Sequence, residues 1–117
     1  MNKRRTGTAY EAIAADYLKS QGYEILTLNY RCRSGEIDLI ARDGRYLVFI
    51  EVKYRTNGEK GAAVAAVDRR KQRTISRVAV FYMIQNRLPE DTPCRFDVVA
   101  IDGEKITLYK NAFDYQG

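Results

Sequence analysis

One stretch of the chain, residues 35–55, carries charged side chains at alternate positions and reads GEIDLIARDGRYLVFIEVKYR. Three carboxylates, Glu36, Asp38 and Glu51, and one amine, Lys53, could do chemistry there. Grouped carboxylate oxygens suit a hard divalent cation such as Mg²⁺ or Mn²⁺. Because the sequence contains no histidine, a histidine general base and a catalytic triad are excluded. Any catalysis must therefore use carboxylates, lysine, tyrosine or a metal bound by oxygen.

A predicted hairpin decides which of these groups share a surface. The Asp-Gly pair at 43–44 suits the centre of a type I′ turn between two strands. This register places Glu36 opposite Glu51 and Asp38 opposite Phe49, and side chains opposite each other lie on the same face. Like charges at that distance repel unless a cation or a proton lies between them.

The simpler alternative is a solvated sheet face, which also shows charges at every second position. The same face, however, carries Ile40, Leu47 and Phe49, so we expect a helix to cover part of it. Lys53 can offset one of the three carboxylates but not all of them. The pattern therefore favours a Mg²⁺ or Mn²⁺ site over a salt-bridged surface.

The elements that must position these residues form one α/β domain, 1–117, with a mixed central sheet flanked by helices in the order α-β-β-β-α-β-β. Gly22 is expected to cap the first helix, because glycine adopts the left-handed conformation that ends helices. The expected elements are a helix at 9–21, strands at 23–29, 35–41 and 46–55, a helix at 67–87, and strands at 94–101 and 105–113, with a basic connector at 30–34 and a loop at 56–63.

The composition narrows the class of partner. The net charge is +5, which favours a polyanionic partner. Cys32 and Cys94 form no CxxC pair and have no histidine beside them, so a zinc site is excluded. We expect a cytoplasmic protein without a membrane partner, since there is no secretory signal pattern and no apolar run of membrane-spanning length.

Together these residues resemble a known nuclease core. The chain resembles the PD-(D/E)xK pattern: Asp38 is followed, after twelve residues, by Glu51-Val52-Lys53. A predicted helix that carries Glu11 precedes these residues. The longer match, GEIDLIARDG…LVFIEVKYR preceded by EAIAADYLKSQGYEIL, resembles the bacterial YraN-like family and the archaeal Holliday junction resolvases. Ile37 stands where the motif name has proline. The resemblance covers nearly the whole chain and implies a restriction-endonuclease-like fold.

The resemblance also implies a role for each motif residue. Asp38 and Glu51 would bind Mg²⁺ or Mn²⁺ directly, assisted by the backbone carbonyl of Val52. Lys53 would orient the attacking water or stabilise charge on the phosphorane, because its ordinary pKa of ~10.4 is too high for a base.

Two further acids have two interpretations each. Residues 8–11, TAYE, form a capping-box pattern in which Glu11 bonds only the N-cap amide. The resemblance adds Glu11 to the catalytic residues at the metal site, and the two roles are compatible. Glu36 either holds a second metal or is the solvated end of a strand.

Basic residues are expected around this site. DRRKQR at 68–73 begins the second predicted helix, where three consecutive cations oppose the helix dipole and a polyanion would relieve that cost. The alternative is a solvated charged face. The expected nucleic-acid-binding residues are Arg31, Arg33, Arg69, Arg70, Lys71 and Gln72, with Lys3, Arg4 and Arg5 on the same rim.

The function implied is that of a metal-dependent endonuclease that hydrolyses phosphodiester bonds in DNA, with structured or branched DNA preferred to a specific duplex sequence. The alternative is a nucleic-acid-binding protein that has this fold and cuts nothing at a useful rate. A glycosidase using two carboxylates suits the basic rim poorly. Symmetric cutting by resolvases implies a homodimer, although the sequence shows no clear apolar interface stripe, and DNA and RNA are not distinguished.

Overall fold

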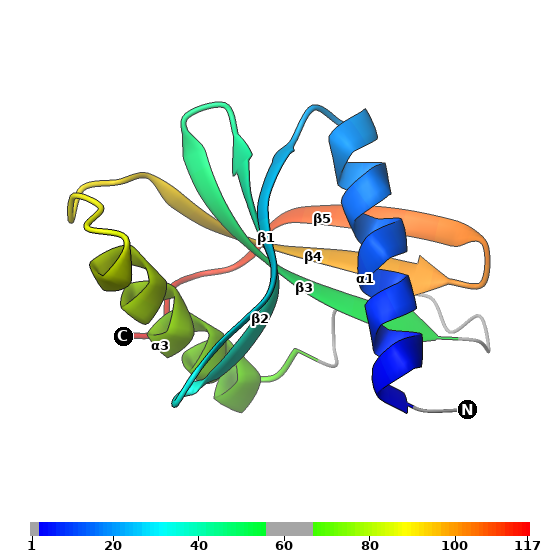
Figure 1. Cartoon of the computed structure of the whole chain (residues 1–117), viewed down its shortest axis with the longest axis horizontal. Helices are drawn as coiled ribbons and strands as arrows, with labels where there is room; N and C mark the ends of the chain where they lie inside the picture. Colours follow the sequence, from blue (N-terminus) through cyan, green and yellow to red (C-terminus); the bar gives the residue numbers. More distant parts are fainter. Residues whose placement is uncertain (1–2, 56–66) are drawn as a thin grey trace.

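The computed structural model describes residues 3–55 and 67–117, and side chains within 9–54 and 67–117 (Figure 1). The predicted loop at 56–63 and the side chains of residues 3–5 lie outside this part. The expected order of helices and strands is confirmed, with a five-stranded mixed sheet. The elements are α1 (Lys3–Ser20), β1 (Glu24–Cys32), β2 (Gly35–Asp43), β3 (Tyr46–Arg55), α3 (Arg69–Gln85), β4 (Cys94–Asp102) and β5 (Lys105–Phe113).

The sheet has the spatial order β1-β2-β3-β4-β5, in which β3 and β4 are parallel and the other neighbours are antiparallel. Side chains of β3 alternate between two cores: Val48 and Ile50 pack with α1, whereas Leu47 and Phe49 pack with α3. A strand buried on both faces needs such a continuous apolar run. Figure 1 shows the two helices towards opposite sides of the strands. No helix in the described ranges is long and apolar enough to cross a membrane.

The β2–β3 turn differs from the predicted one. Asp43 pairs with Tyr46, so the two central residues are Gly44 and Arg45. Gly44 has φ of 61°, whereas Arg45 is not among the residues with positive φ. Glycine at the first central position is typical of a type II′ turn, and a type I′ turn would need positive φ at both positions. The predicted turn type is therefore wrong.

The new turn shifts the hairpin register by two residues. Ile40, and not Asp38, lies opposite Phe49. The predicted pairing of Glu36 with Glu51 is likewise wrong, since the register would bring Asp38 nearer to Glu51. A shift of two positions preserves the side of the sheet on which each side chain lies, so the predicted face of Ile40 and Phe49 is confirmed.

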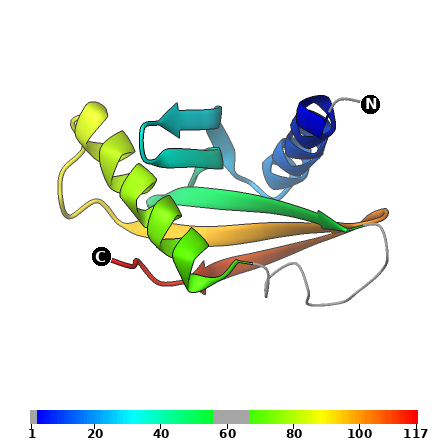
Figure 2. The ribbon, with the colours of Figure 1, turned by 90° about the horizontal axis from the view of Figure 1, so that it is seen from below.

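β2 separates from β3 before the end of the hairpin. The last paired residues are Leu39 and Ile50. Beyond them the amide of Val52 donates to the Asp38 carboxylate, with 2.7 Å between N and Oδ2, in place of a bond to a β2 carbonyl. Ile37 packs with the α3 core, although simple alternation predicts the opposite face. Figure 2 shows this end of the β1–β2 pair raised from the sheet between the two helices.

The first helix begins earlier than predicted. Because α1 spans Lys3–Ser20, Thr8 is an internal helical residue and the predicted capping box is wrong. The predicted end is confirmed: Gly22 has φ of 93°, and the amide of Tyr23 donates to the Leu18 carbonyl at 3.0 Å.

The tip of the β1–β2 hairpin packs on α3. The predicted connector at 30–34 is wrong, because β1 continues to Cys32, which pairs with Gly35. A Cβ atom on Gly35 would lie 2.8 Å from Thr74 Cγ2, and its φ is 146°. Glycine is therefore needed both for the backbone conformation and for the close approach to α3.

α3 is placed by its cap and its apolar stripe. Asp68 is the N-cap, and its Oδ1 accepts a hydrogen bond from the Lys71 amide at 2.8 Å. The helical spacing of Ile75, Val78, Ala79, Tyr82 and Met83 predicts a buried stripe. Ile75, Val78 and Ala79 are indeed buried against the sheet, and Tyr82 and Met83 are partly buried against the same core. This packing brings the first turns of α3 next to β3.

Candidate functional site

A small acid-lined cavity of about 190 Å³ lies where β2 separates from β3. Its walls come from both helices and both strands, so residues from both faces of the sheet meet there. The predicted site residues Glu11, Asp38 and Glu51 converge in it. The lining residues are Tyr10, Glu11, Glu36, Asp38, Glu51, Val52, Tyr54 and Lys71.

Glu51 is the most deeply buried of these acids, with 7% of its surface exposed. The pKa of Glu51 is raised to about 9: burial is the largest cause, a hydrogen bond to Asp38 and the charge of Asp38 also raise it, and the charges of Lys71 and Lys53 lower it. Lys71 Nζ lies 3.4 Å from Glu51 Oε2, yet that oxygen accepts no hydrogen bond within the described residues. The pKa is raised in spite of this contact because burial and Asp38 outweigh the opposing charges of Lys71 and Lys53.

Glu11 reaches the same cavity from α1. Burial is the main cause that raises the pKa of Glu11 to about 7, followed by the charge of Asp38, while a hydrogen bond with Asn29 lowers it. Glu11 Oε2 is also buried and accepts no hydrogen bond from the part of the chain that is described. Asp38 thus interacts with the carboxyl groups of both Glu11 and Glu51, and it is costly for all three to carry a negative charge at once.

The donor set fits a hard divalent cation. Glu11 Oε2 and Glu51 Oε2 are buried and accept no hydrogen bond within the described residues, although Lys71 Nζ lies 3.4 Å from the latter. Such oxygens favour a proton or a cation, and the candidate ligand atoms of the cavity are oxygens. Within the described ranges, no group of three or more acidic or cysteine side chains is arranged to hold a metal ion. Mg²⁺ is nevertheless commonly held by one or two carboxylates, with water and substrate phosphate completing its shell. Asp38 and Glu51 are two carboxylates in the lining of one cavity, so the types of residue present are compatible with that smaller requirement.

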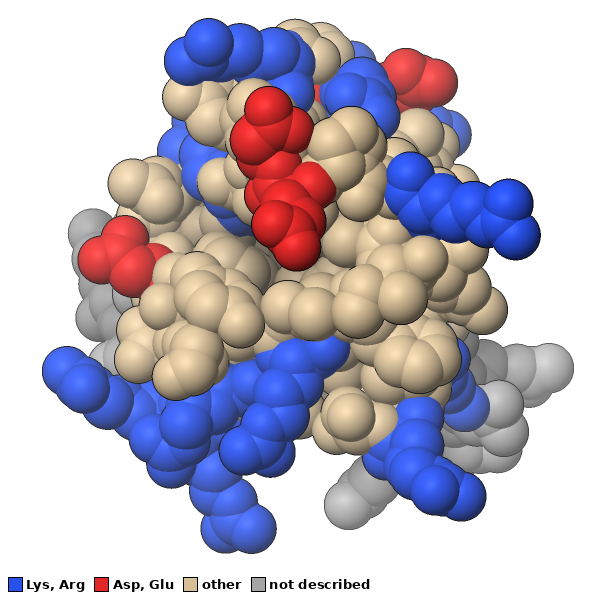
Figure 3. All heavy atoms as spheres, turned by 90° about the vertical axis from the view of Figure 1, so that its left-hand side faces the viewer, with Lys and Arg blue, Asp and Glu red and all other residues tan. Residues whose placement is uncertain are grey.

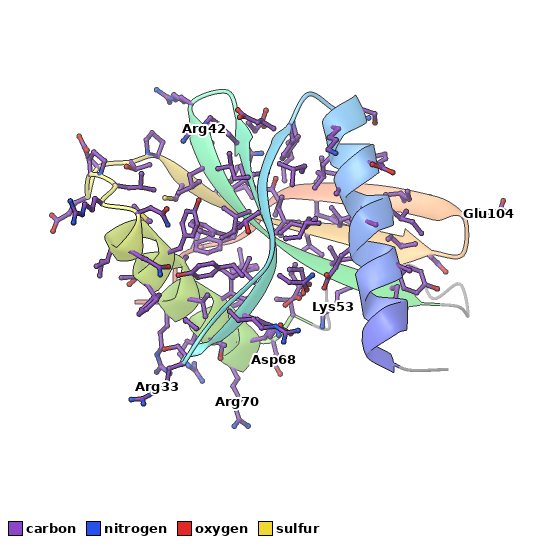
Figure 4. The ribbon with its side chains drawn as sticks, viewed as in Figure 1. Arg33, Arg42, Lys53, Asp68, Arg70 and Glu104 are labelled. Atoms are coloured by element: carbon purple, nitrogen blue, oxygen red, sulfur yellow. The ribbon has the colours of Figure 1, made fainter. Side chains whose placement is uncertain are left out.

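Lys53 and Glu36 are more peripheral than the sequence suggests. Lys53 does not line the cavity, although its charge acts on the pKa of Glu51. In Figure 4 it lies between the β1–β2 hairpin and α1. Glu36 lines the cavity and forms an ion pair with Arg31 at 3.0 Å, with the two side chains 45% and 54% exposed. This pairing agrees with the solvated strand end that was one of the two interpretations of Glu36.

The predicted basic rim is found at one end of the molecule. Arg33, Arg69 and Arg70 are exposed. Figure 4 shows Arg33 and Arg70 extending from the same end as Asp68, and Figure 3 shows lysine and arginine side chains gathered along the lower edge of that side. This end of the molecule therefore offers positive charge to a polyanion. Nucleic-acid binding by these residues stays a prediction.

Three residues of the rim have partners within the protein, and the first of them is Arg31, paired with Glu36. Lys71 contacts Glu51, as described above, and so belongs to the wall of the acid cavity. The side chain of Gln72 donates to the Val67 carbonyl at 2.9 Å. That bond uses one of the two Nε2–H donors of Gln72.

The sequence did not indicate the tyrosines of this site. From the sequence we expect Tyr54 to be a core or edge aromatic and not a stacking platform, whereas in the structure it is 41% exposed. Its ring stacks on Tyr10 with 4.0 Å between centroids and 10° between planes. The available signal was strand alternation, which places Tyr54 with Val52 on the α1 side of β3.

Asp97 of β4, which the sequence predicts to be a strand-edge or structural acid outside the site, is fully buried. Its carboxylate accepts hydrogen bonds from Tyr23 Oη at 2.7 Å, Arg95 Nε at 2.9 Å and the Asn111 amide at 2.9 Å. Arg95 also reaches Asp43 at 2.8 Å. A network satisfied in this way ties Tyr23, just before β1, to β2, β4 and β5.

A larger cavity of about 410 Å³ lies beside α3. Its lining is mostly apolar and includes Phe49, Met83 and Phe96, with Glu90 as its one carboxylate. Because it lacks convergent polar groups, the chemistry is assigned to the smaller acid-lined cavity.

Comparison with known proteins places the chain in a family. Residues 10–101 match the model of "Uncharacterised protein family UPF0102", and this range includes every wall residue of the acid-lined cavity. The chain is 58% identical over 117 residues to a UPF0102 protein of Lachnoclostridium phytofermentans, covering 100% of this chain and 99% of that protein. It is 43% identical over 126 residues to a UPF0102 protein of Alkalilimnicola ehrlichii, covering 100% of both. With a UPF0102 protein of Legionella pneumophila strain Corby it shares 47% identity over 110 residues, 92% of this chain and 93% of that one. The chain therefore belongs to the UPF0102 (YraN-like) family.

Proposed function

We propose that this chain is a PD-(D/E)xK-type endonuclease that hydrolyses phosphodiester bonds in DNA with Mg²⁺ or Mn²⁺. Asp38, Glu51 and the Val52 carbonyl would hold the cation. The observation that carries the proposal is the pair of buried oxygens, Glu11 Oε2 and Glu51 Oε2, that accept no hydrogen bond within the described residues and belong to carboxyl groups that both interact with Asp38. An unsatisfied buried polar group costs about 1–3 kcal/mol, more when charged, and a divalent cation would offset that cost.

The residues of the chain have separate tasks in this proposal. The Val52 amide, 2.7 Å from Asp38 Oδ2, holds that carboxylate in one orientation. Lys71, 3.4 Å from Glu51 Oε2, supplies positive charge at the cavity wall for a phosphate. Glu11, with its pKa raised to about 7, can take up or release a proton near neutral pH. When bound, the cation would lower the pKa of water and stabilise negative charge on the phosphate.

DNA is the proposed partner, and structured or branched DNA is preferred by analogy with resolvases. The exposed Arg69 and Arg70 at the start of α3 support a partner rich in phosphate. Phosphate contacts position a nucleic acid without reading its sequence, so we propose recognition by shape and charge. A homodimer would serve symmetric cutting, and a monomer would serve nicking.

The test is cleavage of labelled duplex, flap, single-stranded and four-way-junction DNA in Mg²⁺, Mn²⁺ or EDTA. We expect metal-dependent products with the wild-type chain and none with Glu51→Gln or Asp38→Asn. Glu104→Gln is the matched control, because Glu104 is exposed in the β4–β5 turn, away from the site (Figure 4). Products that persist in both acid variants, or that never form on any substrate, would reject the nuclease.

A second candidate is nucleic-acid binding without cleavage. It is favoured by the finding that no three-acid metal cluster is present among the described residues. This candidate predicts binding without products in any metal, and equal or tighter binding after Glu51→Gln. In both cases the double variant Arg69→Ala/Arg70→Ala should weaken binding and reduce the slope of log K against log salt by roughly 2, since each lost phosphate contact removes about 0.9.

A further inference from the structure

An exposed aromatic ring lies at the edge of the acid-lined cavity. Tyr54 follows Lys53 at the end of β3 and remains 41% exposed, while Val52, two positions earlier, is 9% exposed in the α1 core. Tyr10 is partly buried against that core. The Tyr54 ring stacks on the Tyr10 ring, with 4.0 Å between the ring centroids and 10° between the ring planes. Both rings line the cavity beside Glu11 and Glu51. The stacked rings of Tyr10 and Tyr54 thus connect the α1 core to the edge of the acid-lined cavity.

This stack presents a flat apolar surface in a strongly polar place. An isolated exposed tyrosine needs no explanation. Here, however, the ring is held in position by Tyr10, which reduces the ordering that a ligand would have to impose on it. Parallel stacking on an aromatic ring is the contact that nucleobases make with proteins that bind single strands.

The size of the cavity decides which part of a nucleotide could enter it. At about 190 Å³ it is smaller than the ~300–1,000 Å³ of ordinary small-molecule pockets. It can therefore admit a phosphate group beside Lys71, whereas a planar base belongs outside, on Tyr54. Bases inside an intact duplex have both faces covered by their neighbours, so they offer no free face to a ring.

We infer that Tyr54, supported by Tyr10, stacks on an unpaired nucleobase next to the phosphate that enters the acid-lined cavity. The substrate class is accordingly DNA with an unpaired nucleotide, such as a gap, flap or junction, in preference to continuous duplex. This inference rests on the proposed function only for the identity of that phosphate as the one that is cut. Tyr54 is assigned a role in specificity, not in the chemical step.

The test compares binding of three labelled DNAs by fluorescence anisotropy, in a Glu51→Gln background with Mg²⁺. They are a gapped duplex, the same gapped duplex with abasic residues in the gap, and the fully paired duplex. Tyr54→Ala should weaken binding to the gapped duplex roughly 5- to 150-fold, the range for loss of one base–aromatic stack. Binding to the abasic and paired DNAs should not change, because neither offers a free base.

Two further variants control for general effects. Tyr54→Phe keeps the ring and should retain the affinity for the gapped duplex. Tyr115→Ala removes another exposed tyrosine, 56% exposed and beside the apolar cavity of α3, and should bind all three DNAs normally. An equal loss on all three DNAs with Tyr54→Ala, or no loss on the gapped one, overturns the inference.

The proposed nuclease and the stacking role can fail separately. In parallel, cleavage of the gapped duplex is measured with Glu51 intact. A base-dependent effect of Tyr54 without any metal-dependent cleavage rejects the nuclease and supports stacking. Cleavage without a base-dependent effect of Tyr54 supports the nuclease and rejects stacking, and absence of binding to every DNA rejects both.

Discussion

Glu51→Gln should make the metal-free protein more stable at alkaline pH, although it should abolish cleavage. Folding buries the Glu51 carboxyl at 7% exposure beside Asp38, with no hydrogen bond to Oε2 within the described ranges. The pKa of Glu51 accordingly rises from its ordinary 4.5 to about 9. Glutamine has nearly the same shape and carries no charge, so it removes the repulsion while keeping the packing.

The sign of the pH dependence follows from which state holds the proton. Between 4.5 and about 9 the folded Glu51 keeps a proton that the unfolded chain releases. Stability from this group is therefore complete below pH 4.5 and is lost as pH rises towards 9. One proton changes the free energy of unfolding by ~1.4 kcal/mol per pH unit, so we expect a loss of about 2–4 kcal/mol between roughly pH 5 and 8.

The assay is urea unfolding of the wild type and Glu51→Gln across this pH range, with and without Mg²⁺. The variant should match the wild type near pH 5, exceed it at pH 8 and show a flatter pH dependence. Mg²⁺ at a hundred times its dissociation constant should stabilise the wild type by about 2.7 kcal/mol and leave the variant unchanged. Glu104→Gln, an exposed carboxylate in the β4–β5 turn, should behave as the wild type.

Two results would refute this reasoning. If Glu51→Gln keeps the pH slope of the wild type, the carboxyl is not held protonated by burial and by Asp38. If Mg²⁺ stabilises the variant as much as the wild type, Glu51 is not a ligand, and the unpartnered oxygens have another explanation.

Three further changes test the fold around the site. Asp97→Ala should destabilise by about 3–5 kcal/mol in urea unfolding, because it leaves the largely buried Arg95 without its main partner; a loss below about 1 kcal/mol would contradict this. Gly35→Ala should lower the midpoint of unfolding, since its Cβ would meet Thr74 Cγ2 at 2.8 Å at a φ of 146°, and an unchanged midpoint would show that the hairpin tip does not pack there. Lys71→Ala should raise the pKa of Glu51 further by removing an opposing charge, so the loss of stability should continue to a higher pH than in the wild type; a loss that levels off at a lower pH than in the wild type would contradict the contact.

Short-range sequence patterns were sufficient to predict most of the fold. The sequence predicted the order of elements, the α3 stripe and the span of β5 because periodicity and turn residues act over a few positions. It failed where two local patterns competed. The Asp-Gly pair fits the centre of a type I′ turn, yet Gly44 occupies the first central position of another turn. The capping-box pattern at 8–11 likewise lies inside a helix that begins at Lys3.

The candidate site, too, has features that the sequence predicted and features that only the structure decided. Sequence alone identified Glu11, Asp38 and Glu51, because their types and spacing match a pattern, and it also placed Phe49 and Glu51 on one face of β3. Tertiary structure alone decided that β2 leaves β3 beside Asp38, so that the acids meet in a cavity and Tyr54 stacks on Tyr10. These contacts join residues far apart in the chain, and their geometry depends on how two helices pack on a twisted sheet, which no short-range pattern encodes.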